Sequence, residues 1–147
     1  MGMIDVSEKR IIKRQAEAAG RIELSPTTIE KIENGQIKKG DPILVAEIAA
    51  MNAAKQTHLL IPHCHQIPLD VAKVTFQVSK ESIEARCFVS AQARTGVEME
   101  ALVGVSMALN CLWDMVKYLE KDELGQYPST RINDIRVLRK EKDEGGG

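Results

Sequence analysis

Aromatic side chains are scarce in this chain of 147 residues, where they make up 3% of the sequence. They are too few to form a stacking platform for nucleic-acid bases. A strong charge of one sign is also missing, because the formal net charge at pH 7 is -1. Nothing in the overall charge draws the chain to nucleic acid or to a membrane surface, so we expect neither as a partner. Any anionic ligand must be bound by local basic clusters.

Cysteine is rare, and its spacing excludes two further classes of protein. The three cysteines lie far apart and form no CxxC pair. This pattern argues against a disulfide framework and against a zinc ribbon, and it is typical of a reducing compartment. The N-terminus shows no signal-peptide pattern, and the longest apolar stretch is interrupted by Ser106, Asn110 and Asp114, so we do not expect a membrane span. The expected location is the cytoplasm.

The chain does contain an alternation of strand and helix patterns. Helix starts are indicated at residues 25–26 and 41–42, where a capping side chain precedes a proline that suits the first helical turn. A long apolar helix is expected at about residues 97–121. Strands are expected at residues 20–24, 72–78, 83–92 and 132–140, the middle two forming a hairpin. This order predicts an α+β fold with a ferredoxin-like antiparallel sheet and two main helices packed on one face.

The length suits one domain with an ordinary hydrophobic core. The first residues are rich in charge and poor in periodicity, so we expect a mobile N-terminal arm at residues 1–18. A single catalytic domain is expected at residues 19–140. The glycines that end the chain predict a flexible tail at residues 141–147.

Polar residues follow one side of the expected long helix. Ser106, Asn110, Asp114, Lys117 and Lys121 recur every three or four residues on an otherwise apolar helix. A solvated edge is the plain explanation, but the apolar flanks favour burial between the sheet and another subunit. In that setting desolvation should raise the pKa of Asp114, while Lys117 should lower it. The two residues are a candidate proton-transfer pair, with a structural ion pair as the alternative.

Two glutamates at the start of this helix point in different directions. Glu98 lies in the first turn, where a carboxylate interacts favourably with the helix dipole. Glu100 lies about 200° further round, and it shares a face with Asp114 to within about 40°. Roughly 21 Å of helix axis separates Glu100 from Asp114, so one chain cannot bring both to a small reacting centre. We therefore expect an oligomer with active sites at subunit interfaces, and a monomer in solution would contradict this.

Histidines and lysines supply the remaining candidates. His63 and His65 alternate about Cys64, so in an extended segment both imidazoles point to one side. HxH alone is a weak metal signal, and we expect contact with phosphate or a polar substrate and no bound metal. Lys39 stands beside a glycine and an expected helix start, which are ingredients of a phosphate site, and Lys55 lies at the other end of that helix. Lysines in such positions are also common on solvated surfaces.

Several longer strings are more specific than these patterns. KKGD, AAKQTHLLIPHCH, TGVEMEAL and WDMVK occur in this order, with MIDVSEK near the N-terminus and INDIRVLRK near the C-terminus. Together they closely resemble the molybdenum cofactor biosynthesis protein C family, the cyclic pyranopterin monophosphate synthases. The resemblance extends from Met3 to about Lys140. It implies a ferredoxin-like fold and a homohexamer, a trimer of dimers, with sites at subunit interfaces.

The resemblance also implies a reaction. Members of the family are phosphorus-oxygen lyases that convert (8S)-3',8-cyclo-7,8-dihydroguanosine 5'-triphosphate into cyclic pyranopterin monophosphate and diphosphate. On this chain the resemblance marks Asp114 as the catalytic acid or base and Lys117 as its partner in proton transfer. It places the other candidates in the substrate-binding pocket: His63, Cys64, His65, Met99, Glu100, Glu98, Lys39, Lys55 and Lys140. It implies no cofactor, and whether magnesium accompanies the triphosphate stays open.

The chain departs from the family pattern in two places. The family usually reads IPLCHPL where this chain has IPHCHQI, so His63 and Gln66 replace leucine and proline. After Lys140 the usual GGKSG tail is replaced by EKDEGGG, which leaves the role of the tail open. Three other interpretations remain: a non-catalytic binding module of the same fold, a metal-binding domain using His63 and His65, and, least favoured, a nucleic-acid-binding protein.

Overall fold

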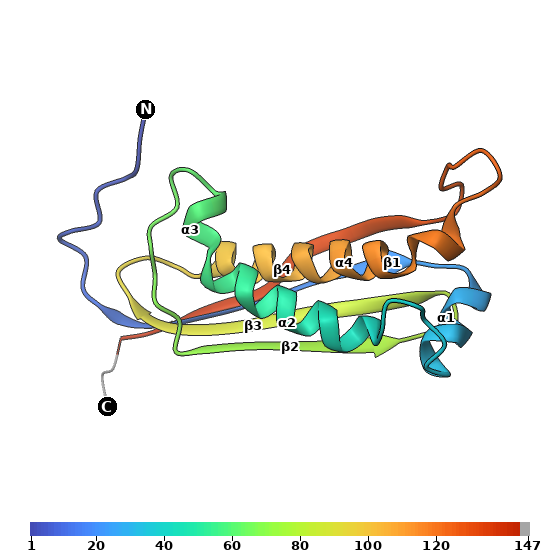
Figure 1. Ribbon diagram of the computed structural model, residues 1–147. Coiled ribbons are helices and arrows are strands. Elements are labelled where there is room, and N and C mark those ends of the chain that lie inside the picture. Colours follow the sequence, from blue (N-terminus) through green and yellow to red (C-terminus); the bar gives the residue numbers. More distant parts are fainter. Residues whose placement is uncertain (145–147) are drawn as a thin grey trace.

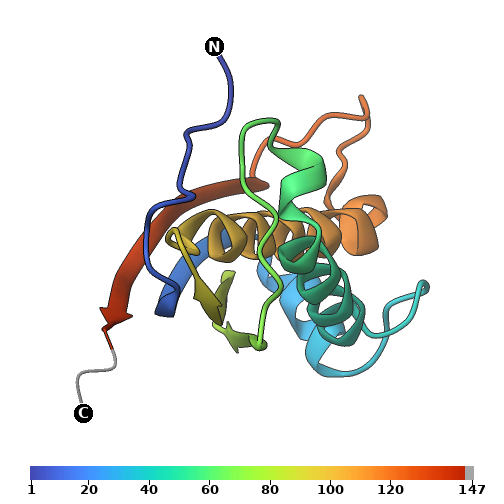
Figure 2. The same cartoon turned by 90° about the vertical axis from the view of Figure 1, so that its left-hand side faces the viewer.

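Figure 1 shows the computed structural model, which describes residues 1–144. The elements are β1 (Ile12–Glu23), α1 (Pro26–Glu33), α2 (Pro42–Lys55), α3 (Thr57–Leu60), β2 (Val71–Val78), β3 (Ser82–Ala93), α4 (Glu98–Glu120) and β4 (Arg131–Asp143). The strands lie in the order β2-β3-β1-β4, and each neighbouring pair is antiparallel. The helices pack on one face of this sheet (Figure 2). The expected ferredoxin-like α+β fold is confirmed, with α2 and α4 as its two main helices.

The first strand is longer than expected and corrects the N-terminal boundary. β1 begins at Ile12, so the prediction of an arm that extends to residue 18 is wrong for residues 12–18. β1 is a central strand, because it pairs with β3 on one side and with β4 on the other. Its alternation is inconspicuous in the sequence because the buried positions Arg14, Ala16 and Ala18 carry a charged residue and two small ones.

The last strand also passes the expected boundary. β4 continues beyond Lys140 to Asp143, so residues 141–143 belong to the sheet and not to a tail. Residues 145–147, the end of the expected tail, lie outside the described residues. Lys140, the last residue of the expected strand, thus lies inside β4, where it pairs with Ala16 of β1.

The core lies between the sheet and the two main helices. Val105 and Leu109 of α4 lie directly over Gly20 of β1, where an added Cβ would come within 2.9 Å of the first side chain and 2.8 Å of the second. Such a close approach of helix and sheet requires glycine. α2 packs on α4 through small buried side chains: Ala46, Ala50, Ala53 and Ala54. The long helix is therefore held between the sheet on one side and α2 on another.

α4 is the one helix among residues 1–144 that is long and apolar enough to cross a membrane. It also packs on β1, β3 and α2. The core helix of a globular domain meets the same criterion of length and composition, so the apolar character of α4 is explained by its packing.

Candidate active site

A cavity of about 440 Å³ opens at the end of the molecule where α4 begins. The loop after α3 contributes His63, Cys64 and His65 to its wall, and the start of α4 contributes Glu98 and Met99. Prolines near both ends keep this loop out of a helical conformation. We call this the histidine-side cavity. Its volume suits a small organic ligand, and it brings together five of the predicted substrate-binding residues.

Glu100 projects inward from the same end of α4, and only 2% of its surface is exposed. Burial raises the pKa of its carboxyl group. Its Oε2 lies 3.8 Å from the Sγ of Cys64, and its Oε1 has no hydrogen-bond partner in the described structure. Burial and the charge of Glu100 together raise the pKa of the Cys64 thiol. A carboxyl group with a raised pKa beside a cavity is a candidate to exchange a proton with a ligand.

Glu98 connects the histidine-side cavity with a second cavity of about 370 Å³, because it lines both. Its Oε1 accepts a hydrogen bond of 3.4 Å from the Nζ of Lys140. Its Oε2 is buried without a hydrogen-bond partner in the described structure. The neighbouring cavity is basic, since Lys9, Lys140 and Lys142 all line it. Glu98 thus lies in the first turn of α4, as predicted, and also forms part of the wall between the two cavities.

Gly96 makes room for the Glu98 carboxylate. A Cβ at this position would collide with Oε2 of Glu98, although the backbone there is not in the left-handed region. The collision is with the end of a flexible side chain, so a larger residue would displace the carboxylate before it displaced the backbone. The glycine of the TGVEMEAL string therefore determines where Glu98 points.

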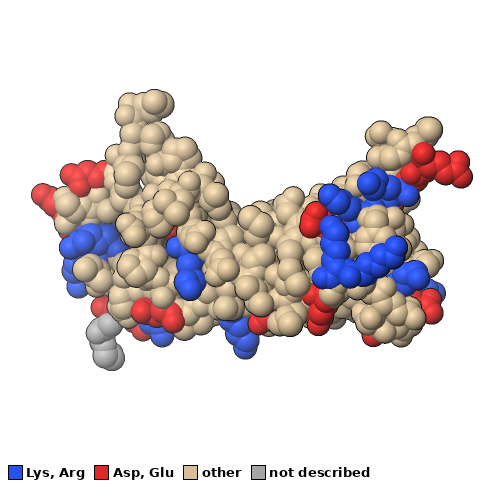
Figure 3. All heavy atoms as spheres, in the orientation of Figure 1, with Lys and Arg blue, Asp and Glu red and all other residues tan. Residues whose placement is uncertain are grey.

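Three more of the predicted residues gather near the other end of α4. The carboxylate of Asp114 lies 3.3 Å from the Nζ of Lys117 and 3.4 Å from the Nζ of Lys39. Lys39 also donates a hydrogen bond of 2.8 Å to the backbone carbonyl of Asp114. We call Lys39, Asp114 and Lys117 the lysine-side cluster. Figure 3 shows basic side chains gathered at this end of the molecule, where α1 and the last turns of α4 lie.

The electrostatics of Asp114 differ in part from the expectation. Lys117 and then Lys39 lower the pKa of Asp114, so it is ionised at neutral pH. Its side chain is 61% exposed within one chain. Burial therefore raises the pKa of Asp114 by less than the two lysines lower it. The reason is that the loop after α3 covers only the first turns of the helix. Within the described residues, no segment lies over Asp114 in the way that Cys64 lies over Glu100.

One chain does not bring the histidine-side cavity and the lysine-side cluster together. Glu100 and Asp114 are separated by roughly 21 Å along the helix axis. Lys55 joins neither group, because it lies exposed at the end of α2 and forms no ion pair among the described residues. The predicted site residues therefore fall into two groups and one isolated lysine.

Comparison with known proteins places the whole chain in a family. A sequence model of the MoaC family matches residues 3–145. The chain belongs to the MoaC family. A relative from Thermococcus kodakarensis is 55% identical over 142 residues, which cover 97% of this chain and 91% of the relative. One from Sulfolobus acidocaldarius is 50% identical over 143 residues, which cover 97% of this chain and 100% of the relative.

Both relatives carry the name probable cyclic pyranopterin monophosphate synthase. A third protein with this name, from Thermococcus onnurineus, is 53% identical over 143 residues, covering 97% of this chain and 92% of its own. The resemblance that the sequence strings indicated is thus confirmed over nearly the whole of this MoaC-family chain.

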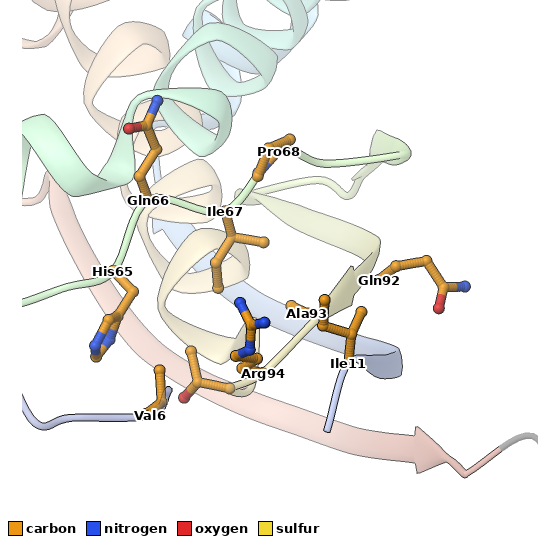
Figure 4. Close-up of a pocket in the computed structure, with 10 residues that line it drawn as sticks. Val6, Ile11, His65, Gln66, Ile67, Pro68, Gln92, Ala93 and Arg94 are labelled. Carbon is orange, nitrogen blue, oxygen red and sulfur yellow. The ribbon is translucent and has the colours of Figure 1, made fainter. Parts of the chain in front are cut away.

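Sequence reasoning missed the part that the N-terminal residues take in the site. Gly2, Ile4, Val6 and Lys9 line the histidine-side cavity. A smaller cavity of about 240 Å³ lies next to it, and Val6 and His65 both line that one as well (Figure 4). The string MIDVSEK could have indicated this. It has no helix or strand periodicity but still matches the family pattern, and such loop segments often carry binding residues.

Sequence reasoning also missed a partly buried polar cluster around Glu120, the last residue of α4. Its carboxylate accepts hydrogen bonds from the backbone N–H and the hydroxyl of Ser25, and from the hydroxyls of Thr28 and Thr130. A glutamate at a helix C-terminus opposes the helix dipole, and that unfavourable placement was the signal that Glu120 has other partners. The cluster joins the end of α4 to the start of α1 and to the loop before β4.

The donors needed for a metal centre are not grouped in this MoaC-family chain. Among residues 1–144, no set of three or more His, Cys, Asp or Glu side chains is arranged to hold a metal ion. His63 and His65 therefore lack the further protein ligands that a structural or catalytic zinc site requires. The expectation that the protein binds no resident metal stays a prediction.

Proposed function

We propose that this chain is a cyclic pyranopterin monophosphate synthase of molybdenum cofactor biosynthesis. The reaction is a phosphorus-oxygen lyase step that converts (8S)-3',8-cyclo-7,8-dihydroguanosine 5'-triphosphate into cyclic pyranopterin monophosphate and diphosphate. The observation that carries the proposal is the similarity, over 97% of the chain, to proteins that bear the synthase name. The two groups of acids, histidines and lysines on α4 and its neighbours support it.

The chemistry calls for acids and bases beside positive charge. Forming a cyclic monophosphate requires a hydroxyl oxygen of the substrate to attack the α-phosphorus as the bond to diphosphate breaks. The hydroxyl proton must pass to a base, and the leaving diphosphate carries the displaced negative charge. Asp114 is ionised and can accept a proton, whereas Lys117 and Lys39 are cations that can donate one or balance the phosphate charge.

The two ends of α4 suit different parts of the substrate. Burial raises the pKa of Glu100 and of Cys64 beside the histidine-side cavity, which suits proton exchange with a ring system that has several exchangeable protons. The neighbouring basic cavity, with Lys9, Lys140 and Lys142, fits the triphosphate. Magnesium bound to the phosphates would enter with the substrate, since no protein metal site is formed by the described residues.

A complete site requires a second copy of the chain, so we propose a homohexamer, a trimer of dimers, with active sites at subunit interfaces. The separation of Glu100 from Asp114 supports this, because a neighbouring subunit can place its lysine-side cluster against the first subunit's cavity. Large apolar side chains on α2 and α3 are exposed in the single chain and are available for burial: Leu44 53%, Ile48 51%, Leu59 71% and Leu60 54%. Figure 3 shows uncharged surface between the two ends of this face.

We propose a cytoplasmic location, which accords with three free cysteines.

Incubation with freshly prepared cyclic dihydro-GTP tests the proposal. We expect equal amounts of diphosphate and pterin product, with GTP itself unreacted. Metal analysis of protein purified without added metal accompanies this assay and is expected to find none bound. Protein that binds the substrate without releasing diphosphate would favour a non-catalytic binding module of the same fold.

A further inference from the structure

The N-terminal segment makes a specific contact with the candidate site. The backbone carbonyl oxygen of Ile4 lies 2.7 Å from Nε2 of His65. A carbonyl oxygen only accepts hydrogen bonds, so Nε2 must carry the proton and donate it. In the neutral ring, Nδ1 is then the nitrogen with a free lone pair. The contact therefore determines the tautomer of His65 as well as the position of its ring.

The segment that provides this carbonyl is held in a defined conformation. The side chain of Asp5 accepts a hydrogen bond of 2.8 Å from the backbone N–H of Ser7. A turn follows, in which the N–H of Lys9 donates to the carbonyl of Val6 at 3.0 Å. The hydrogen bond from Ser7 lowers the pKa of Asp5. We call residues 2–9 the N-terminal strap.

The strap runs along the end of the molecule where the loop after α3 lies, as both ribbon views show (Figures 1 and 2). Four of its residues line the histidine-side cavity. Val6 lies beside His65 in the lining of the smaller cavity (Figure 4). The strap is therefore a wall of the candidate site, and its removal would leave His65 without the acceptor that fixes its ring.

We propose that the N-terminal strap is a positioning element that holds His65 as a neutral Nε2–H tautomer, so that Nδ1 receives a hydrogen bond or a proton from an N–H or O–H group of the substrate. A lone pair on Nδ1 repels the oxygens of a phosphate group. His65 thus recognises the ring system, and the lysines recognise the phosphates. The role of His65 toward the substrate rests on the proposed function. The tautomer of His65 does not depend on it.

NMR of protein labelled with 15N-histidine tests the tautomer directly, because the chain has three histidines and the two neutral tautomers differ in their ring nitrogen shifts. At pH 8 the signals of His65, assigned by their loss in His65→Asn, are expected to show Nε2–H and an unprotonated Nδ1. Deletion of residues 2–6 is expected to convert these signals to a mixture of tautomers while His58 stays unchanged. Circular dichroism and the melting temperature verify that the deletion variant is folded.

Point variants separate the carbonyl from the side chains. Ile4→Ala keeps the backbone carbonyl and is expected to keep the Nε2–H signature, whereas Asp5→Ala loosens the turn and is expected to weaken it. Inorganic triphosphate, used as a probe, is expected to leave the His65 signals unchanged. An Nδ1–H tautomer in the intact protein, an imidazolium at pH 8 with or without triphosphate, or an unchanged signature after the deletion would overturn the proposal.

Activity gives the second readout. The deletion is expected to reduce kcat by about 10²-fold, which is the scale of a misplaced proton-transfer group. If the protein turned out to lack synthase activity, the NMR result would still establish or refute the strap. If the deletion changed the tautomer but left kcat unchanged, the positioning role in the reaction would be wrong.

Discussion

Glu100 and Asp114 lie on the same side of α4, yet Glu100 is 2% exposed and the side chain of Asp114 is 61% exposed. Their ionisation differs accordingly. Burial raises the pKa of Glu100, and neighbouring lysines lower the pKa of Asp114. One helix therefore carries a carboxyl group with a raised pKa near its start and one with a lowered pKa near its end. Such a pair of carboxyl groups with opposite perturbations is typical of acid and base roles in catalysis.

Asp114→Asn is expected to abolish most of the synthase activity without unfolding the protein. Loss of an acid or base group costs about 10²- to 10⁴-fold in kcat. The side chain is exposed, so the free energy of unfolding should change by less than about 0.5 kcal/mol. Product assays and urea unfolding measure the two effects, with the exposed Glu123→Gln as the matched control. Collapse of the oligomer with Asp114→Asn would indicate a structural ion pair.

Glu100→Gln is expected to stabilise the protein at neutral and alkaline pH. Because the pKa of Glu100 is raised from its ordinary value of 4.5, the native state binds more protons than the unfolded state above that pH. The contribution of Glu100 to the free energy of unfolding therefore falls as pH rises through 4.5, and it levels off above the raised pKa. Glutamine does not titrate, so its advantage should grow to about 1 kcal/mol by pH 8.

Urea unfolding of Glu100→Gln at several pH values, at one protein concentration, measures this difference. Glu123→Gln serves as the control, since an exposed carboxylate should show no such trend. A difference that shrinks as pH rises would mean that Glu100 is ionised and satisfied in the folded protein. Activity should be lost in the same variant, because a group that destabilises the fold is typical of a functional site.

Gly96→Ala is expected to reduce activity through Glu98 while leaving stability nearly unchanged. The new methyl group would push the Glu98 carboxylate away from Lys140, and the flexible side chain can move without disturbing the backbone. A tenfold or larger loss of kcat/KM corresponds to about 1.4 kcal/mol of transition-state binding. In a Glu98→Gln background the same substitution should have little further effect. Additive losses in the double variant would show that Gly96 acts independently of Glu98.

Much of the fold follows from periodicity. The hairpin of β2 and β3 and the long helix α4 were predicted because their apolar residues recur at strand and helix spacing. The N-terminal half of β1 was missed because Ala16 and Ala18 bury little apolar surface. Arg14 is a charged residue at a buried position, where its guanidinium group donates hydrogen bonds to the carbonyls of Ala93 and Arg94. Such a strand is recognised by its neighbours in the sheet, which a single sequence does not display.

The site was predictable where its contacts are local. Asp114 and Lys117 are three residues apart on a helix, and their contact is confirmed. The approach of Lys39 to Asp114 depends on tertiary structure and was not predicted, since the family resemblance placed Lys39 in the pocket without naming its partner. The burial of Glu100 depends on the loop that carries Cys64, so a helical wheel alone gives the same environment to Glu100 and Asp114.

Glu120→Ala is expected to destabilise the protein strongly although Glu120 is remote from both cavities. The carboxylate accepts hydrogen bonds from Ser25, Thr28 and Thr130, and Thr28 and Thr130 are buried. Leaving buried donors unsatisfied costs about 1–3 kcal/mol each, so we expect a loss of roughly 3 kcal/mol. Urea unfolding measures this, and Glu123→Ala in the neighbouring turn should change the free energy by less than about 0.5 kcal/mol. Equal effects of the two substitutions would contradict the role of the cluster.

The central claim is that one active site combines the histidine-side cavity of one subunit with the lysine-side cluster of another. Co-expression of Asp114→Asn and Glu100→Gln chains, each inactive alone, tests it most directly. In mixed oligomers about a quarter of the interface sites would receive both intact residues, so activity should return to about that fraction of the unsubstituted level. Mixed oligomers, isolated with two different tags, that stay as inactive as either parent would contradict the claim.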